Sequence, residues 1–342
     1  MKIFFLAQYY FDLYKPILKE LEKQGHDVFL VEDILLPADP NFRELPFYVK
    51  IKRHLYRLIK NVSYKYWSNK IKTEKRYSES YDLFLCIDGI SFHPFLLKHL
   101  KEINPKLKSI LYLWDTNRYY KFYRYKHCFN KVCTFDPQDA ASIKGISILP
   151  SYWVPTPIIP VKYALSMVGS DHDNRLEIVS NVYRQLEKNN INSFLRVVVR
   201  EPSPLKSWKR KFKYFRDKYQ KEIDLWNYKK TLPFVVEKKF SGEEVMQLID
   251  ESECVLDTDK PIQTGATQRV IWALARGKKV ISTNVNLLKM PFYRKEQIHI
   301  IDRDNPVIDI DFITKHIDFT QSAYIQKLRI DMWVNDLISI EE

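Results

Sequence analysis

Glycine is scarce in this 342-residue chain, which contains only 7, and this excludes a glycine-rich linker architecture. The 4 cysteines, Cys86, Cys128, Cys133 and Cys254, form no CxxC pair and no Cys/His cluster, so we expect buried free thiols in a reducing compartment. No stretch approaches the ~20 apolar residues of a transmembrane helix. The apolar run at residues 1–7 is too short for a signal peptide. The sequence therefore predicts a cytoplasmic protein.

The composition is that of a globular protein with a strong positive charge. Hydrophobic residues make up 45% and charged residues 28%, which excludes a disordered chain, and the length favours two domains. Aromatic residues reach 14% and indicate aromatic-lined cores or clefts. The formal net charge of +13 implies an anionic partner: nucleic acid, anionic lipid or a phosphorylated substrate.

The first half of the chain alternates between predicted strands and helices. Ile3–Ala7 is a continuous apolar run, as expected of a strand buried on both faces. Residues 12–24 have helical spacing and end at Gly25, and a strand follows at Val28–Val31. This βαβ opening predicts a parallel sheet. Further strands are predicted at Leu83–Ile87, Ser109–Leu113 and Val132–Phe135.

A second α/β series follows a proline-rich stretch at 150–160, which we interpret as an extended crossover. Ser241 and Glu244 form a capping box at a helix start. Helices are predicted at 173–189, 268–276 and 320–338, and strands at Ala164–Val168, Leu195–Val199, Cys254–Leu256, Lys279–Ser282 and Ile298–Ile301. Parallel sheets bind ligands beyond the carboxyl ends of their strands, so two such halves predict a ligand site in a cleft between them.

The segment 257–283 is the most specific motif. A strand ends in a polar loop that opens a helix, and the free backbone N–H groups and dipole of that helix favour negative charge there. Thr264, Gly265 and Thr267 lie where they could hold a diphosphate, and Arg269 lies one turn into the helix to neutralise its charge. The alternative is an ordinary capped helix.

A second loop, 168–175, repeats this arrangement between a predicted strand and its helix. Gly169 and Ser170 could approach a phosphate or a sugar hydroxyl, and Arg175 could reach a diphosphate. The candidate donor-binding residues are therefore Gly169, Ser170, Arg175, Arg200, Gln263, Thr264, Gly265, Thr267 and Arg269.

These motifs in this order resemble a known family. The residues concerned are Val168-Gly169-Ser170 with Arg175, the run Pro261 to Arg269, Ala273-Leu274, Gly277 to Ile281, Thr283-Asn284 and, upstream, Leu111 to Asp115 and Thr134 to Asp139. Together they resemble bacterial GT-B glycosyltransferases of lipopolysaccharide and capsule synthesis, related to the CgeB-like group. The resemblance spans most of the chain except its two basic aromatic segments.

The resemblance implies an α/β fold of the GT-B type, with two Rossmann-like domains whose parallel sheets face a central cleft. It implies an acceptor-binding domain over 1–158, a nucleotide-sugar-binding domain over 159–318, and a C-terminal helix within 319–342 that packs back on the first domain. Many retaining members carry two glutamates at the phosphate loop. Thr264 and Trp272 stand in their places here, which removes the expected ribose contact.

For the catalytic base we consider carboxylates at strand ends of the first half. Asp88 and Asp115 each follow a predicted strand, and an inverting transfer needs a base within hydrogen-bond reach of the acceptor hydroxyl. The alternative role for both is helix capping or a bond to backbone. Asp136 and Asp139 frame a proline and are better explained as helix capping. His93 and His172, which are possible bases, are better explained as polar loop residues. Asp136, Asp139, His93 and His172 are therefore secondary candidates.

Two basic aromatic segments, 50–76 and 206–230, are the second informative feature. Lysine and arginine beside tyrosine and tryptophan are typical of helices on an anionic membrane surface. The same composition suits single-stranded nucleic acid, whose bases stack on aromatic rings. The third alternative is a solvated face above a buried aromatic stripe. We favour the membrane or a lipid-linked acceptor.

We therefore expect a glycosyltransferase that moves a sugar from a nucleotide-sugar, in the first instance a UDP-sugar, to a lipid-linked or lipopolysaccharide acceptor. It would act without a metal or cofactor on the inner face of the cytoplasmic membrane, and without nucleic acid as partner. One alternative is a GT-B-like polyol-phosphate transferase of a teichoic-acid-like polymer. The other is a non-catalytic binding module.

Overall fold

The computed structural model describes residues 1–9, 12–33, 62–116, 118, 122–204, 212–317 and 321–340. The contacts among these residues divide the chain into two compact units. Unit 1 comprises Met1–Val154, Ile262–Gly265 and Lys327–Glu342, and unit 2 comprises Pro155–Pro261 and Ala266–Gln326. The chain passes from the first unit to the second inside the proline-rich stretch 150–160.

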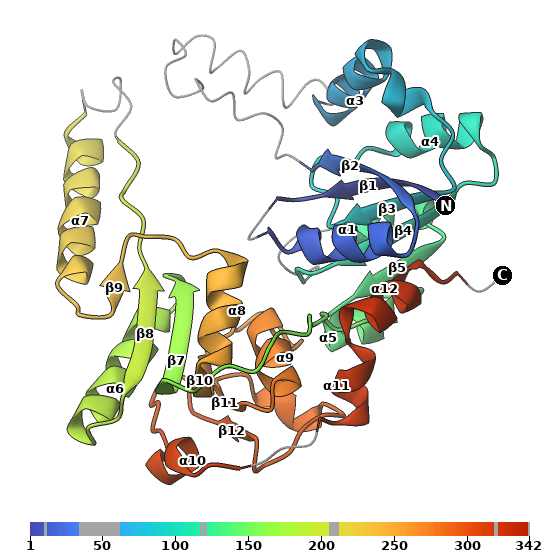
Figure 1. Ribbon diagram of the computed structural model, residues 1–342. Helices are drawn as coiled ribbons and strands as arrows, with labels where there is room; N and C mark the ends of the chain where they lie inside the picture. The colour runs from blue at the N-terminus through green and yellow to red at the C-terminus, as the bar shows by residue number, and fades with distance from the viewer. Residues whose placement is uncertain are drawn as a thin grey trace. The chain divides into compact units, whose positions relative to one another are not determined.

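Unit 1 contains a six-stranded parallel sheet with the strand order β2-β1-β3-β4-β5-β6 (Figure 1). Its strands are β1 (Lys2–Ala7), β2 (Asp27–Glu32), β3 (Leu83–Ile87), β4 (Lys108–Leu113), β5 (Lys131–Thr134) and β6 (Ser147–Ile148). Every residue of Ile3–Ala7 and of β3 is buried. These apolar runs form central strands because both faces of a parallel sheet are covered, which confirms the sequence prediction.

The helices of unit 1 lie on both faces of its sheet. They are α1 (Tyr14–Lys23), α3 (Val62–Thr73), α4 (Pro94–Ile103), α5 (Pro137–Ser142) and α12 (Ile330–Ile338), with the 3-10 turns η2 (Lys75–Ser78) and η3 (Phe122–Cys128). Leucines of α4 and Trp67 of α3 share one core with the side chains of β1, β3 and β4 on that face. On the other face α12 contacts both α1 and β4.

The C-terminal segment is part of the core of unit 1. Trp333 of α12 is fully buried, and its ring lies edge-on to Tyr112 of β4 with centroids 5.0 Å apart. Its indole N–H donates to the carbonyl oxygen of Pro150 at 2.7 Å. The predicted single helix at 320–338 is wrong in one respect: α11 (Ala323–Lys327) and α12 are separate, because Arg329 forms a β-bridge to Trp153 between them.

Unit 2 contains a second six-stranded parallel sheet, with the order β12-β11-β10-β7-β8-β9. Its strands are β7 (Tyr163–Ser170), β8 (Ser193–Val198), β9 (Val235–Val236), β10 (Ser252–Asp257), β11 (Lys279–Ser282) and β12 (Ile298–Ile300). The other elements are α6 (Arg175–Lys188), α7 (Lys213–Lys230), α8 (Gly242–Asp250), α9 (Gln268–Ala275), η5 (Val285–Lys289) and α10 (Ile310–Thr314). The capping box of Ser241 and Glu244 at the start of α8 is confirmed.

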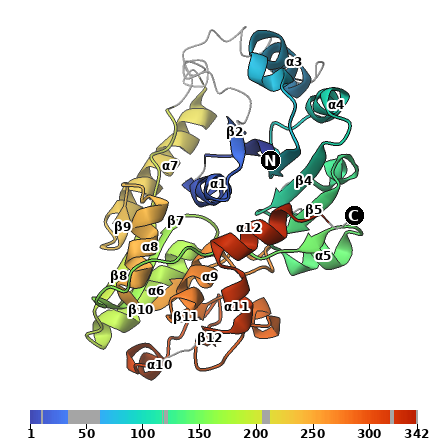
Figure 2. The same cartoon turned by 45° about the vertical axis from the view of Figure 1, so that its right-hand side comes forward.

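The faces of this sheet are covered by different helices, as Figures 1 and 2 show. Buried residues of α6 and Ile313 of α10 share one core with alternate residues of β7, β8 and β10. Helices α8 and α9 contact each other and lie against β7, β10 and β11. In the part of the chain that the structure describes, no helix combines the length and apolar character needed to cross a membrane.

The strand order of each unit contains one switch point, where the chain turns from building the sheet in one direction to building it in the other. In unit 2 it lies between β7 and β10, and in unit 1 between β1 and β3. Open α/β sheets bind ligands beyond the carboxyl ends of the strands at such points. The carboxyl ends of the strands at these two switch points are therefore the expected ligand sites.

Candidate functional site

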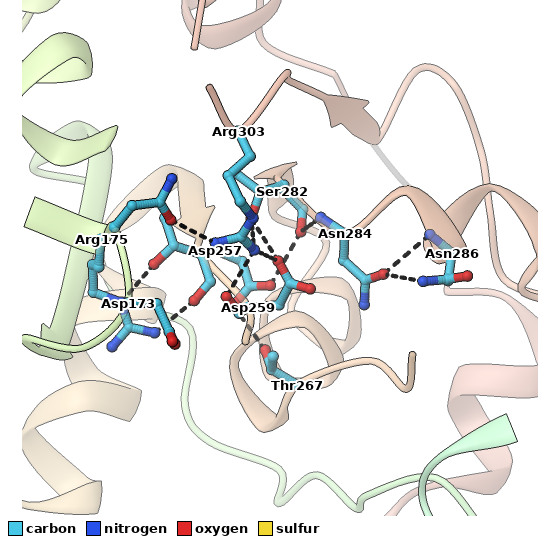
Figure 3. A network of polar contacts seen from close by, with 12 residues as sticks. Asp173, Arg175, Asp257, Asp259, Thr267, Ser282, Asn284, Asn286 and Arg303 are labelled. Carbon is cyan, nitrogen blue, oxygen red and sulfur yellow. Dashed lines mark hydrogen bonds and ion pairs between the residues drawn. The ribbon is translucent and has the colours of Figure 1, made fainter. Parts of the chain in front are cut away.

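At the switch point of unit 2, three arginines link the loops that follow β7, β10 and β12. Figure 3 shows two of them, Arg175 and Arg303, converging with Asp257, Asp259 and the surrounding polar side chains. The third, Arg269, begins the first turn of α9. Arg175 and Arg269 are both predicted donor-binding residues, and the structure brings the two into one cluster.

Arg175 is 7% exposed and uses its guanidinium to join the two loops of the switch point. It donates to the carbonyl oxygen of Ser170 (2.7 Å) after β7 and to the hydroxyl (2.6 Å) and carbonyl (2.5 Å) oxygens of Thr258 after β10. All three acceptors are neutral, and no described residue forms an ion pair with it. Burial, and then the positive charge of Arg269, lower the pKa of Arg175 to about 9.

Gly169 lies directly beside the guanidinium of Arg175. A Cβ atom at this position would lie 2.7 Å from Nη1 of Arg175, closer than side-chain atoms pack, so a larger residue would displace the guanidinium. The predicted close approach of a ligand to Gly169 stays a prediction. Ser170 contributes its carbonyl oxygen to the same contact.

Arg269 of α9 also links β7 and β10 at the switch point. Its Nη1 donates to the buried carboxylate of Asp257 at 2.8 Å and its Nη2 to the carbonyl oxygen of Val168 at 2.6 Å. Thr267 caps α9 by accepting from the backbone N–H of Val270, and its hydroxyl donates to Asp257 at 2.8 Å. Asp257 also accepts from Ser282 at 3.1 Å, so β7, β10 and β11 are tied together at their carboxyl ends.

Arg303, which the sequence analysis missed, completes the cluster from the loop after β12. It donates to the side chains of Asn174 (3.0 Å) and Thr283 (3.0 Å) and pairs with Asp259. Burial is the main cause that raises the pKa of Asp259. The sequence signal was only that Arg303 stands shortly after a predicted strand, which is too common a position to single it out.

The three arginines differ in their partners. Arg269 and Arg303 each form an ion pair with a buried carboxylate, Asp257 and Asp259 respectively, whereas Arg175 forms none with a described residue. The charges of Asp257 and Asp173 act on Arg175 through space, and its direct acceptors are all neutral. Two helix N-termini, those of α6 and α9, begin in the same loops and add partial positive charge. This arrangement is suited to an anion.

The predicted residues 263–265 belong to unit 1 and contact its other residues. The backbone N–H and the hydroxyl of Thr264 both donate to Asp136, at 2.7 and 2.6 Å. A Cβ atom on Gly265 would lie 2.5 Å from the carbonyl oxygen of Phe135. Gln263 donates to Asp115 at 3.2 Å. These contacts lie within unit 1, and the predicted contacts of these residues to a diphosphate stay a prediction.

The predicted residue Arg200 and the position of Trp272 stand apart from the cluster. Arg200 follows β8, is exposed, and makes no hydrogen bond or ion pair with any described residue. Trp272 of α9 is 5% exposed, and its indole N–H is buried without a hydrogen-bond partner in the described structure. The indole thus occupies protein interior at the position where the resembled family carries its second glutamate.

At the carboxyl edge of the sheet in unit 1, Asp88 is almost fully buried, at 2% exposed. Its carboxylate accepts from the backbone N–H of Trp114 at 3.0 Å and from the side chain of Gln8 at 3.2 Å. Burial and the nearby charge of Asp115 raise the pKa of Asp88 well above its ordinary value. Its backbone has a φ of 58°, a left-handed conformation that aspartate tolerates better than most residues.

Asp115 differs from Asp88 in access. It follows β4, is partly exposed, and has one oxygen bonded by Gln263. Of the two predicted base candidates, it is the one whose carboxylate lies at the surface of unit 1. A base must reach a hydroxyl of its substrate, so access favours Asp115.

The secondary candidates of unit 1 have structural contacts. Asp136 is fully buried and caps α5 by accepting from the backbone N–H groups of Gln138 and Asp139, which confirms the capping prediction. Asp139 accepts from the hydroxyl of Thr116 at 2.9 Å. His93 caps α4 through Nδ1, which accepts from the backbone N–H of Phe95 at 3.1 Å.

The two basic aromatic segments prove unlike each other. Residues 50–61 and 206–211 lie outside the described residues. In α3, Trp67 is fully buried and donates to the carbonyl oxygen of Ser91 at 2.8 Å, so it cannot be a membrane-facing aromatic residue as predicted. In α7 no residue is buried, and Tyr214 is 71% and Tyr228 62% exposed. Tyr64 of α3 is 43% exposed, so both helices carry exposed aromatic residues, and α7 carries the larger number of them.

No protein-family model matches this sequence, and no curated protein matches it in a sequence search. Solved structures do match. A lipopolysaccharide outer core galactosyltransferase, WaaB in its apo form, is 13% identical with a TM-score of 0.52, covering 98% of each chain. The E. coli trehalose-6-phosphate protein bound with UDP-2-fluoro glucose is 10% identical with a TM-score of 0.57, covering 99% of this chain and 98% of its own.

A third match is sucrose-phosphate synthase from Thermosynechococcus elongatus, at 11% identity and a TM-score of 0.51, covering 88% of this chain and 86% of its own. At these identities the likeness establishes the fold. The two parallel six-stranded sheets with interleaved helices are the GT-B fold, as the sequence predicted.

Proposed function

We propose that the protein is a glycosyltransferase that holds a nucleotide-sugar donor at the switch point of unit 2. The observation that carries this proposal is Arg175, a buried guanidinium with neutral acceptors only. A buried charge without a direct ion pair is costly, and a bound anion lowers that cost. The diphosphate of a nucleotide-sugar supplies such an anion, and one structural neighbour was solved with UDP-2-fluoro glucose bound.

The chemistry that the cluster supports is stabilisation of a leaving diphosphate. As the bond between the sugar and the diphosphate breaks, negative charge grows on the phosphate oxygens. Arg175, Arg269 and the N-termini of α6 and α9 provide fixed positive charge at this edge of the sheet. We propose that they act in place of a metal ion, and that a UDP-sugar is the donor.

The acceptor is proposed to bind at unit 1, where Asp115 would take the proton of its hydroxyl. Tyr9 extends this edge of the sheet: it is 43% exposed and stacks on Tyr14 with centroids 4.4 Å apart and planes at 16°. Such a supported aromatic face suits the apolar side of a sugar ring. Stacking of this kind agrees with a glycan acceptor on lipopolysaccharide or a lipid carrier.

A thermal-shift panel tests the donor proposal first. The purified protein is heated with UDP, GDP, CMP, CDP, dTDP and their common sugar conjugates. A ligand at 100 times its Kd stabilises the folded state by about 2.7 kcal/mol, which raises Tm by several degrees. We expect the largest shift with UDP and a UDP-sugar.

The panel also separates the alternatives. A response confined to CDP and its polyol conjugates would favour polyol-phosphate transfer, and phosphorus in the product would establish it. A folded protein that responds to no nucleotide would contradict the proposal and favour a non-catalytic module.

We further propose that α7 binds the anionic inner face of the cytoplasmic membrane. Between Lys213 and Lys230 it carries six basic and three acidic residues, all at least partly exposed. Tyr214, Leu225 and Tyr228 are exposed beside these charges. Exposed aromatic and basic side chains on one helix are typical of interfacial binding.

Vesicle sedimentation tests this surface. The protein should bind vesicles of 30% phosphatidylglycerol and 70% phosphatidylcholine, but not phosphatidylcholine alone. Lys218→Glu with Lys221→Glu should weaken binding by about 10-fold or more, because each basic residue near the surface contributes about 1 kcal/mol. The matched control, Arg184→Glu with Lys188→Glu on α6, should bind as wild type does. Equal loss in both variants would mean that net charge alone, and not α7, causes the binding.

A further inference from the structure

The loop between β7 and α6 contains a histidine–aspartate pair that neither the donor site nor the fold explains. His172 Nδ1 lies 2.7 Å from Oδ2 of Asp173, and both side chains are partly exposed. Asp173 has a φ of 50°, so its backbone is held in the left-handed region. Arg175, the first residue of α6, follows this loop, and its backbone N–H donates to the carbonyl oxygen of His172 at 3.2 Å.

The pair fixes which imidazole nitrogen carries a proton. An ionised carboxylate only accepts hydrogen bonds, so Nδ1 of His172 must donate to Asp173. In the neutral ring the other nitrogen, Nε2, is then an unprotonated acceptor. Nε2 has no hydrogen-bond partner among the residues that the structure describes. Protonation would convert Nε2 from an acceptor into a charged donor.

The charges around His172 oppose that protonation in the free protein. Partial burial lowers the pKa of His172, and Arg175 and Lys260 lower it further, although Asp173 acts in the opposite direction. The other carboxylate of this loop, Asp171, is already paired with Lys229 of α7 at 2.6 Å. The lowered pKa favours the neutral form of His172, which lies beside an arginine that forms no ion pair with a described residue.

We propose that His172 is a phosphate-binding residue that becomes an imidazolium when the donor binds, so that donor binding takes up a proton. This inference rests on the proposed function, because it requires a diphosphate at the arginine cluster. The negative charge of a bound diphosphate offsets the positive charge of Arg175, and this favours a second positively charged group beside it. Nε2–H then donates to a phosphate oxygen, and Asp173 holds the ring in position.

The coupling has a definite direction. Between the pKa of His172 in the free protein and its higher value in the complex, the complex holds more protons than the free protein. Raising the pH through this interval therefore weakens donor binding, with a Kd that rises by up to about tenfold per pH unit. Below the interval the ring is charged in both states, and the Kd stops changing.

Calorimetry of UDP-glucose binding tests the inference. If another sugar conjugate of the thermal-shift panel binds more tightly, it replaces UDP-glucose in this experiment. The diphosphate of a nucleotide-sugar has no group that titrates near pH 7. Titrations at pH 7 in PIPES and in Tris, whose heats of ionisation differ, report the number of protons taken up. We expect up to one proton per wild-type complex, no uptake in His172→Gln, and reduced uptake in Asp173→Asn.

A matched control is His316, which forms the other histidine–acid pair of unit 2, with Glu253 at 2.8 Å. His316→Gln should retain the full proton uptake and the pH dependence of the Kd. Wild-type binding without proton uptake, or uptake that survives in His172→Gln, would overturn the role of His172 and leave the donor site intact. If no nucleotide-sugar binds to the folded protein at any pH, the proposed function itself fails.

Discussion

Arg175→Met is expected to weaken donor binding by about 10- to 100-fold without lowering the stability of the protein. A hydrogen bond to a charged group contributes about 1.5–3 kcal/mol, and each 1.4 kcal/mol is a factor of ten in Kd. The buried guanidinium has neutral acceptors only, so hydrogen bonds offset its desolvation in part but no direct ion pair does so in the free protein. Methionine fills the same space without this cost.

Stability and binding should therefore change in opposite directions. Urea unfolding of Arg175→Met should give a free energy equal to or above that of wild type, while calorimetry shows the loss of UDP-sugar affinity. This combination distinguishes a residue kept for its ligand from a residue kept for the fold. A variant that loses stability and retains its affinity would place Arg175 in the architecture alone and remove the main support for the donor site.

Arg276 is the matched control. It is also a buried arginine of unit 2, but it pairs with the carboxylate of Asp250. Arg276→Met leaves that carboxylate without its partner, and breaking a buried ion pair destabilises a protein by about 3–5 kcal/mol. We expect this variant to unfold at lower urea concentration, and to bind the donor normally while folded.

Asp115→Asn is expected to lower turnover by about 10²–10⁴-fold, the usual contribution of a general base, with donor affinity nearly unchanged. Asparagine retains the acceptor that Gln263 contacts at 3.2 Å but cannot take a proton from an acceptor hydroxyl. The measurement is single-turnover transfer from the best donor of the thermal-shift panel, beside the calorimetric Kd. Full turnover in this variant would exclude Asp115 as the base.

Asp88→Asn tests whether Asp88, rather than Asp115, is the catalytic base. Because burial raises the pKa of Asp88 in the folded state, wild type loses stability as the pH rises from the unfolded value, near 4, through the folded value. The variant lacks this loss. Its advantage in the free energy of unfolding should therefore grow with pH, by ~1 kcal/mol for each pH unit between the two pKa values, as urea unfolding at several pH values would measure. If turnover instead depends on Asp88, this variant and not Asp115→Asn will lose it.

The sequence by itself determined the elements and much of their local chemistry. The buried runs Ile3–Ala7 and Leu83–Ile87 could be recognised as central parallel strands because such strands are apolar on both faces. The helix starts at Ser241 and Asp136 could be recognised because a cap bonds residues only two or three positions away. Interactions of such short range are encoded in neighbouring residues, and the order of these elements predicted the α/β fold.

Only the tertiary structure decided which of the marked residues meet. Arg303 reaches Asn174, 129 positions away, and Thr264 bonds Asp136, 128 positions away. Nothing local distinguishes a partly exposed carboxylate after a strand from a buried one, so the sequence does not separate Asp115 from Asp88. The order in which strands assemble into a sheet determines which loops lie together at the switch point. That order therefore decides both the different exposure of Asp115 and Asp88 and the lack of a direct ion pair at Arg175.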